Sequence, residues 1–79
     1  MSTPMYIIVG RLRASGEAVL HTAYSPIAYK YEIAAMTEYR AVIWGERESL
    51  FHALKTLPWL NPSERLNLAR KLQQTINFF

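Results

Sequence analysis

The chain of 79 residues contains no cysteine and no aspartate, and it has only three glycines. Without cysteine there can be no disulfide bond, no thiol catalysis and no thiolate metal site. Gly10, Gly16 and Gly45 stand alone, so neither nucleotide-binding glycine fingerprint is present. The longest apolar runs, 5–9 and 41–44, are far too short to span a bilayer, and the N-terminus lacks the pattern of a signal peptide. These absences predict a cytoplasmic protein that does not enter a membrane.

What is present suits one small folded domain, which we place at residues 1–79. Hydrophobic residues make up 51% of the chain and aromatic residues 13%, which is too apolar for intrinsic disorder. A chain of this length buries only about 60–65% of the surface that its unfolded form exposes. Little of it can be set aside for an enclosed cavity, so we expect function to lie on a face or in a shallow groove.

The N-terminal part predicts a β-hairpin. Residues 5–13 are rich in β-branched and aromatic side chains, residues 14–17 supply a turn, and residues 18–24 predict the returning strand. Gly10 within the first strand indicates a bulge or a close backbone approach. A third strand is expected near residues 39–44.

The segment 27–36 is ambiguous. Ser25-Pro26 before it is typical of a turn or of a helix start, and no glycine or proline interrupts the segment. Against a helix, Tyr29, Tyr31 and Ile33 alternate with charged residues at the period of a strand. The composition around Glu32 to Met36 favours a helix slightly, and both alternatives stay open.

The C-terminal half predicts two helices. Leu50, Leu54 and Leu57 recur on one face of a helix over residues 46–57, which Pro58 ends. Asn61-Pro62-Ser63-Glu64 combines an N-cap, a proline at the first helical position and a glutamate at the third. The expected fold is therefore α+β, with a small antiparallel sheet packed on one face against two C-terminal helices. The other face should be wet and carry the polar strand residues, which are Arg11, Arg13, Thr22 and Arg40.

Reactive groups are few. His21, Glu48 and His52 are the one conceivable metal set, but two of them form an ordinary i, i+4 helix pair, and we expect no metal. Ser15, Ser25 and Ser63 have turn or cap roles, and we expect Ser49 to be solvated in a helix. With neither cysteine nor aspartate the catalytic inventory is thin. The prediction is a protein that is not an enzyme and has no cofactor.

The aromatic and basic residues favour binding to a macromolecule. Tyrosine, tryptophan and arginine dominate the energetics of protein interfaces. The candidate partner-binding residues are Trp59, Tyr29, Tyr31, Arg11, Arg13, Lys30 and Arg40. Trp59 is the best single candidate for an exposed anchor, with packing against the core as its equal alternative. By class-level analogy alone, short chains of this kind are often regulators, adaptors or inhibitors, many of them encoded by phages and plasmids.

Two further interactions stay open. The net charge of +3 permits a nucleic-acid-binding regulator. It would use either the C-terminal helical pair, in which Ser63, Arg65 and Asn67 would contact bases, or a basic sheet surface with Arg11, Arg13 and Arg40. The basic residues are scattered rather than gathered in a stripe, so a protein partner is favoured. The apolar end, Ile76 to Phe79, either folds back on the sheet or enters a second copy of the chain, which leaves a homodimer open.

Overall fold

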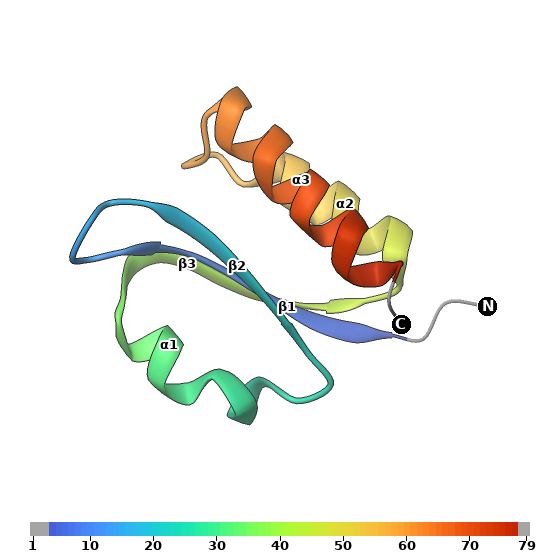
Figure 1. Ribbon diagram of the computed structural model, residues 1–79, viewed down its shortest axis with the longest axis horizontal. Coiled ribbons are helices and arrows are strands. Elements are labelled where there is room, and N and C mark those ends of the chain that lie inside the picture. Colours follow the sequence, from blue (N-terminus) through green and yellow to red (C-terminus); the bar gives the residue numbers. More distant parts are fainter. Residues whose placement is uncertain (1–3, 78–79) are drawn as a thin grey trace.

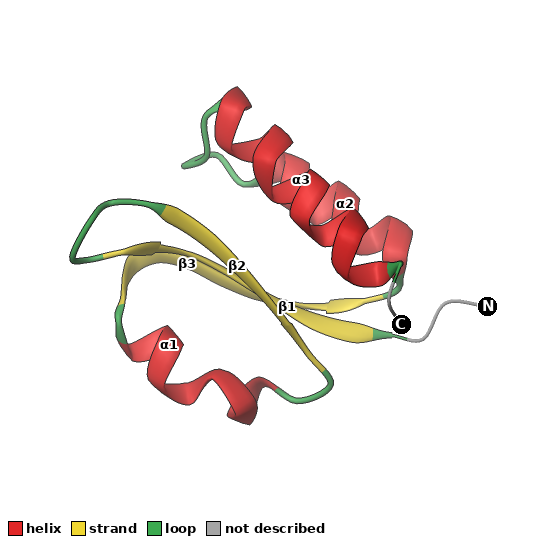
Figure 2. Cartoon of the chain, viewed as in Figure 1, coloured by secondary structure: helices red, strands yellow, loops and turns green. Residues whose placement is uncertain are grey.

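The computed structural model describes residues 4–77 and has three layers (Figures 1 and 2). Three antiparallel strands form the middle layer in the order β2-β1-β3: β1 spans Met5–Leu12, β2 Ala18–Ala23 and β3 Met36–Gly45. Two helices, α2 (Arg47–Thr56) and α3 (Pro62–Ile76), cover one face. A short 3₁₀-helix, η1 (Pro26–Tyr29), and the short helix α1 (Lys30–Ala34) lie on the opposite side. The α+β fold predicted from the sequence is confirmed.

The core lies between the sheet and the two long helices. Alternate residues of β1, namely Met5, Ile7 and Val9, point into it and meet Leu50 and Leu54 of α2. Leu20, Leu60, Leu68 and Leu72 complete this apolar cluster. Among the described residues no polar or charged side chain is fully buried. The hydrophobic effect on this one face is therefore the main force that holds the helices on the sheet.

The segment 26–34 is the main departure from the expected single covered face. The alternation of Tyr29, Tyr31 and Ile33 suggested a strand, but the chain is helical there, as the slight preference for a helix predicted. Ser25 caps η1 by accepting a hydrogen bond from the backbone N–H of Ile27. We call residues 24–35 the arm, because they connect β2 to β3 across the second face of the sheet.

Gly10 lies where β1 and β3 change register. Pairing is regular from Met5↔Gly45 to Gly10↔Arg40, and the next pair is Leu12↔Met36. A Cβ atom at Gly10 would collide with the side chain of Met36, which lies against the glycine. Of the two alternatives predicted for Gly10, the bulge is confirmed by the register shift, and the close neighbour is the side chain of Met36 rather than another backbone. β3 begins at Met36, three residues earlier than expected.

Candidate functional site

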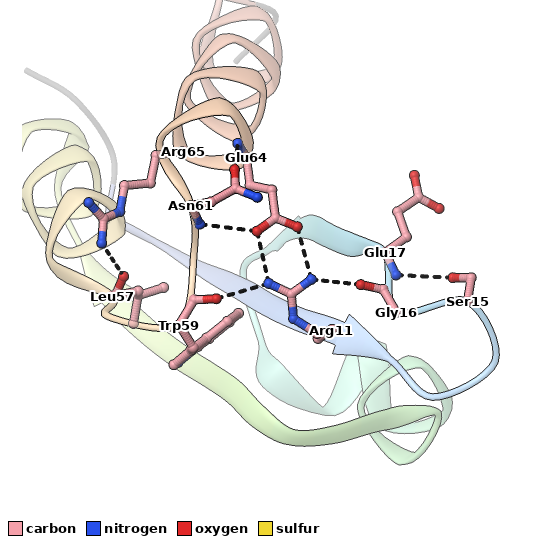
Figure 3. A network of polar contacts seen from close by, with 9 residues as sticks. All are labelled: Arg11, Ser15, Gly16, Glu17, Leu57, Trp59, Asn61, Glu64 and Arg65. Carbon is pink, nitrogen blue, oxygen red and sulfur yellow. Dashed lines mark hydrogen bonds and ion pairs between the residues drawn. The ribbon is translucent and has the colours of Figure 1, made fainter.

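Arg11 is the centre of a network of polar contacts (Figure 3). Its guanidinium donates two hydrogen bonds to the carboxylate of Glu64, at 2.8 and 2.9 Å. It also donates to the carbonyl oxygens of Gly16, at 2.7 Å, and Trp59, at 2.9 Å. One side chain thereby joins the hairpin turn, the connector between α2 and α3, and the first turn of α3. Such paired, charge-assisted bonds are stronger than neutral ones and fix the geometry of both partners.

The same network lowers the pKa of Glu64 to about 2. The hydrogen bonds from Arg11 are the main cause, and the backbone N–H of Asn61 adds to them. The pKa of Arg11 is raised for the matching reason, its hydrogen bond to Glu64. Both side chains are mostly covered, with 24% and 22% of their surface exposed. This ion pair therefore stabilises the fold, and Arg11 is not a free basic group.

Arg11 and Thr22 were expected on the open face of the sheet, and this expectation is wrong. Arg11 follows Met5, Ile7 and Val9 in the alternation of β1, so its side chain points to the helices. Thr22 pairs with Ile7 and lies on that side too. The period of two in β1 contained this information, because residues 5, 7, 9 and 11 must share one face.

Two of the predicted partner-binding aromatics have contacts within the fold. Trp59 packs against the core, with its ring tilted against that of Tyr39 at a centroid distance of 6.3 Å. Tyr29 stacks on His21 at 4.9 Å, and its hydroxyl donates to the carbonyl of Thr22 at 2.7 Å. Burial lowers the pKa of His21, and Lys71 lowers it further. The contacts of Tyr29 attach the arm to β2.

The other predicted residues lie at the surface on or beside the arm. Lys30 and Tyr31, in the first turn of α1, are exposed, and Tyr31 leaves 81% of its surface open to solvent. Arg13 is also exposed and donates to the carbonyl of Ala34 at 3.3 Å, which places it at the end of α1. Arg40 pairs with Gly10, on the side of the sheet that the arm crosses. The structure thus places Arg13 beside α1, the helix that contains Lys30 and Tyr31.

Three further apolar residues belong to this side of the molecule. Ile27 of η1 is 79% exposed, so most of this aliphatic side chain is open to solvent. Val42 and Trp44 of β3 are also exposed, and the Trp44 ring lies 6.2 Å from that of Tyr6. Ile27 was not among the candidates drawn from the sequence, because its exposure depends on where the arm lies. For Val42 and Trp44 the sequence did contain a signal, because alternate residues of a strand from Arg40 to Trp44 lie on the same face of the sheet.

Two shallow grooves lie elsewhere on the surface. One, of about 300 Å³, runs between β2 and α3 and is lined by Glu17, Ala18, Val19, Glu64, Asn67, Leu68 and Lys71. The other, of about 320 Å³, lies over α2 and α3 and is lined by Arg47, Glu48, Phe51, His52, Lys55 and Gln73. Glu48 and His52 share this second groove, but His21 is on β2. Within residues 4–77 no three acidic or histidine side chains gather as metal ligands.

The start of α3 was the expected reader of nucleic-acid bases. Its Arg65 is half-buried and donates to the carbonyl of Leu57 at 2.8 Å, so this guanidinium is turned inward. Asn67 lines the groove beside Glu17 and Glu64, while Ser63 is exposed. These residues do not form one basic surface. Of the predicted C-terminal contacts, Ile76 packs on the core, and Phe78 and Phe79 lie outside the described residues.

No helix in the described part of the chain has the length and apolar character needed to cross a membrane. No protein-family model, curated protein or solved structure matches this chain significantly. Its function must therefore be inferred from its own residues.

Proposed function

We propose that the protein is a small binding module that docks onto another protein through the arm. The exposure of Ile27 and Tyr31 carries this proposal. These two large side chains, on consecutive short helical elements, leave 79% and 81% of their surface in solvent. They stand four positions apart in the chain; interaction surfaces gather exposed apolar groups, and tyrosine is a frequent anchor of such surfaces.

The charge beside these two residues suggests the chemistry of the partner. Lys30 lies next to Tyr31 in the chain, and Arg13 is hydrogen-bonded to the end of α1. Because the whole chain carries a net charge of +3, an acidic protein surface with an apolar pocket is the complementary partner. In this proposal Tyr31 and Ile27 enter the pocket, and the two basic groups speed and orient the encounter.

The test compares the wild-type protein with Ile27→Ala, Tyr31→Ala and a matched control, Leu66→Ala. Leu66 is an apolar residue of α3 that is also exposed, but it lies away from the arm. Proteins captured from lysate are identified, purified and titrated against each variant by calorimetry. We expect Tyr31→Ala to raise the dissociation constant about tenfold or more, and Leu66→Ala to leave it unchanged.

Failure to capture any protein, or equal binding by all four proteins, would contradict the proposal. Nucleic-acid binding is the competing hypothesis, and a second set of titrations tests it. Duplex DNA and single-stranded RNA are titrated at two salt concentrations. Tight binding with a steep salt dependence, insensitive to Tyr31→Ala, would replace the protein-docking proposal.

A further inference from the structure

Within residues 4–77, no strand pairs with the outer side of the β3 backbone. The sheet order β2-β1-β3 places it at an edge, and its ten residues make it the longest strand. Natural proteins usually shorten, bulge or charge such an edge, because its unpaired N–H and C=O groups can pair with another chain. The two halves of β3 differ in how regular their edge backbone is.

The first half of β3 is irregular. Pairing with β1 shifts register between Arg40 and Met36. In this part the backbone N–H of Tyr39 bonds to the hydroxyl of Thr37 at 3.1 Å, and the guanidinium of Arg40 donates to the carbonyl of Thr37 at 3.0 Å. These local bonds occupy groups that a further strand would need. This half of the edge is therefore poorly suited to strand addition.

The second half of β3 is regular and open. From Arg40 to Gly45 each residue opposes one residue of β1, with no break in register. Glu46, with φ −81° and ψ 166°, continues the extended backbone by one residue, and its side chain makes no capping bond to α2. Seven consecutive extended residues, 40–46, are thus available at the edge.

The side chains along this edge complement themselves. Arg40, Val42 and Trp44 lie on the face of the arm, and Glu46 is the next residue in the same alternation. This order is positive, apolar, apolar and negative. If a second copy pairs antiparallel with Ile43 opposite Ile43, then Arg40 faces Glu46 and Val42 faces Trp44, each pair occurring twice. Opposite charges and a β-branched residue beside an aromatic ring are favourable cross-strand pairs.

The opposite face of the edge fits the same register. There Ala41 faces Gly45, so small residues meet beside the central pair of Ile43 side chains. The other edge strand, β2, has no such pattern, because Val19, His21 and Ala23 share the corresponding face and include no pair of opposite charges. The exposure of Val42 and Trp44, 46% and 59%, supplies apolar surface that this pairing would cover.

We propose that two copies of the chain associate by antiparallel pairing of residues 40–46, with Ile43 on the two-fold axis. The product is one continuous six-stranded sheet. Because the axis is perpendicular to the sheet, the two helix layers lie together on one face and the two arms on the other. This proposal does not depend on the docking role of the arm, since Ile27 and Tyr31 are not part of the edge.

Charge reversal tests the Arg40–Glu46 pairs. Sedimentation equilibrium is measured for the wild-type chain, Arg40→Glu, Glu46→Arg and an equimolar mixture of the two variants. Each variant alone places like charges opposite one another twice, so we expect its dimer dissociation constant to rise about tenfold or more. In the mixture every pair is again opposite in charge, so the heterodimer should regain the wild-type affinity.

Matched controls separate this effect from general changes in charge or helix stability. Glu48→Arg reverses a charge in the first turn of α2, outside residues 40–46, and Arg13→Glu does so in the hairpin turn, where Arg13 bonds to the end of α1. Both should dimerise like the wild type, and so should Tyr31→Ala. A wild-type chain that stays monomeric at millimolar concentration, or a dimer that ignores both edge reversals, would overturn the proposal.

Single thiols test the register, because the chain has no cysteine of its own. Under mild oxidation, Ile43→Cys should form an intermolecular disulfide, since directly opposed residues lie within disulfide range. Val42→Cys should not, because that position faces Trp44 of the second copy. Cross-linking through position 42 in preference to position 43 would contradict the proposed pairing even if a dimer forms.

Discussion

At the scale of single residues, the decisive feature is the number of hydrogen bonds that Arg11 donates within the fold. Four of its hydrogen bonds hold three segments together, and Glu64, 53 positions away in the chain, supplies two of the acceptors. A basic residue that sequence composition counts as a candidate for partner binding is thereby committed to the fold. Gly10 is committed in the same way, because the side chain of Met36 occupies the space where its Cβ would be.

The low pKa of Glu64, about 2, predicts a specific pH dependence of stability. A carboxylate whose folded-state pKa is depressed contributes stability above its unfolded-state pKa, near 4.5, and loses it as the pH falls toward 2. We expect Glu64→Gln to lower the free energy of unfolding at neutral pH by about 1–2 kcal/mol, allowing for partial solvent screening. The difference from wild type should shrink steadily below pH 4.5.

Urea denaturation of both proteins at several pH values between neutral and acidic measures this difference. Glu17→Gln, which removes an exposed carboxylate from the same hairpin, serves as the control and should show no comparable loss at neutral pH. A constant difference between wild type and Glu64→Gln at every pH would mean that the lost contact is not an ion pair.

At the scale of elements, α3 is the segment with the clearest local signal. Asn61 accepts a hydrogen bond from the backbone N–H of Glu64 at 2.7 Å, and the carboxylate of Glu64 accepts one from the backbone N–H of Asn61 at 3.1 Å. This capping box was predicted from the four residues 61–64, and the helix begins at Pro62 as expected. A local signal of this kind succeeds because all of its bonds are made within one turn.

Removal of the cap should destabilise the whole protein modestly. We expect Asn61→Ala to lower the free energy of unfolding by about 1 kcal/mol, because one N–H of the first turn loses its acceptor. Thermal or urea denaturation checks this value. Asn67→Ala, an exposed change one turn later in α3, is the control and should alter stability by less than half as much. Equal effects of the two substitutions would argue against a role for the cap.

At the scale of the whole molecule, the two sides of the sheet differ in how firmly they are packed. The helix side buries an apolar cluster contributed by α2, α3 and two strands. The arm side is covered only by two short helical elements, and α1 itself has no buried residue. A segment that exposes Ile27 and Tyr31 and buries little is suited to adapt to a partner, and it should also open most easily.

Amide hydrogen exchange should reveal this difference directly. We expect the amides of α1 to exchange by local opening, at rates well above those of the central strand β1, which should open only on global unfolding. Tyr29→Phe removes the hydrogen bond from the arm to Thr22, so it should speed exchange in the arm and leave β1 unchanged. Equal protection of α1 and β1 would show instead that the arm is an integral layer of the fold.

The amino-acid sequence by itself determined the elements whose signals are local. The hairpin turn, the two long helices and the start of α3 with its capping box depend on backbone preferences and periodicities that act over a few residues. Only the tertiary structure decided to which face of the sheet Arg11 points, whether residues 27–36 are helix or strand, and which apolar side chains stay exposed. Those outcomes depend on contacts between distant segments, such as Arg11 with Glu64 and Tyr29 with His21, and short-range preferences do not encode them.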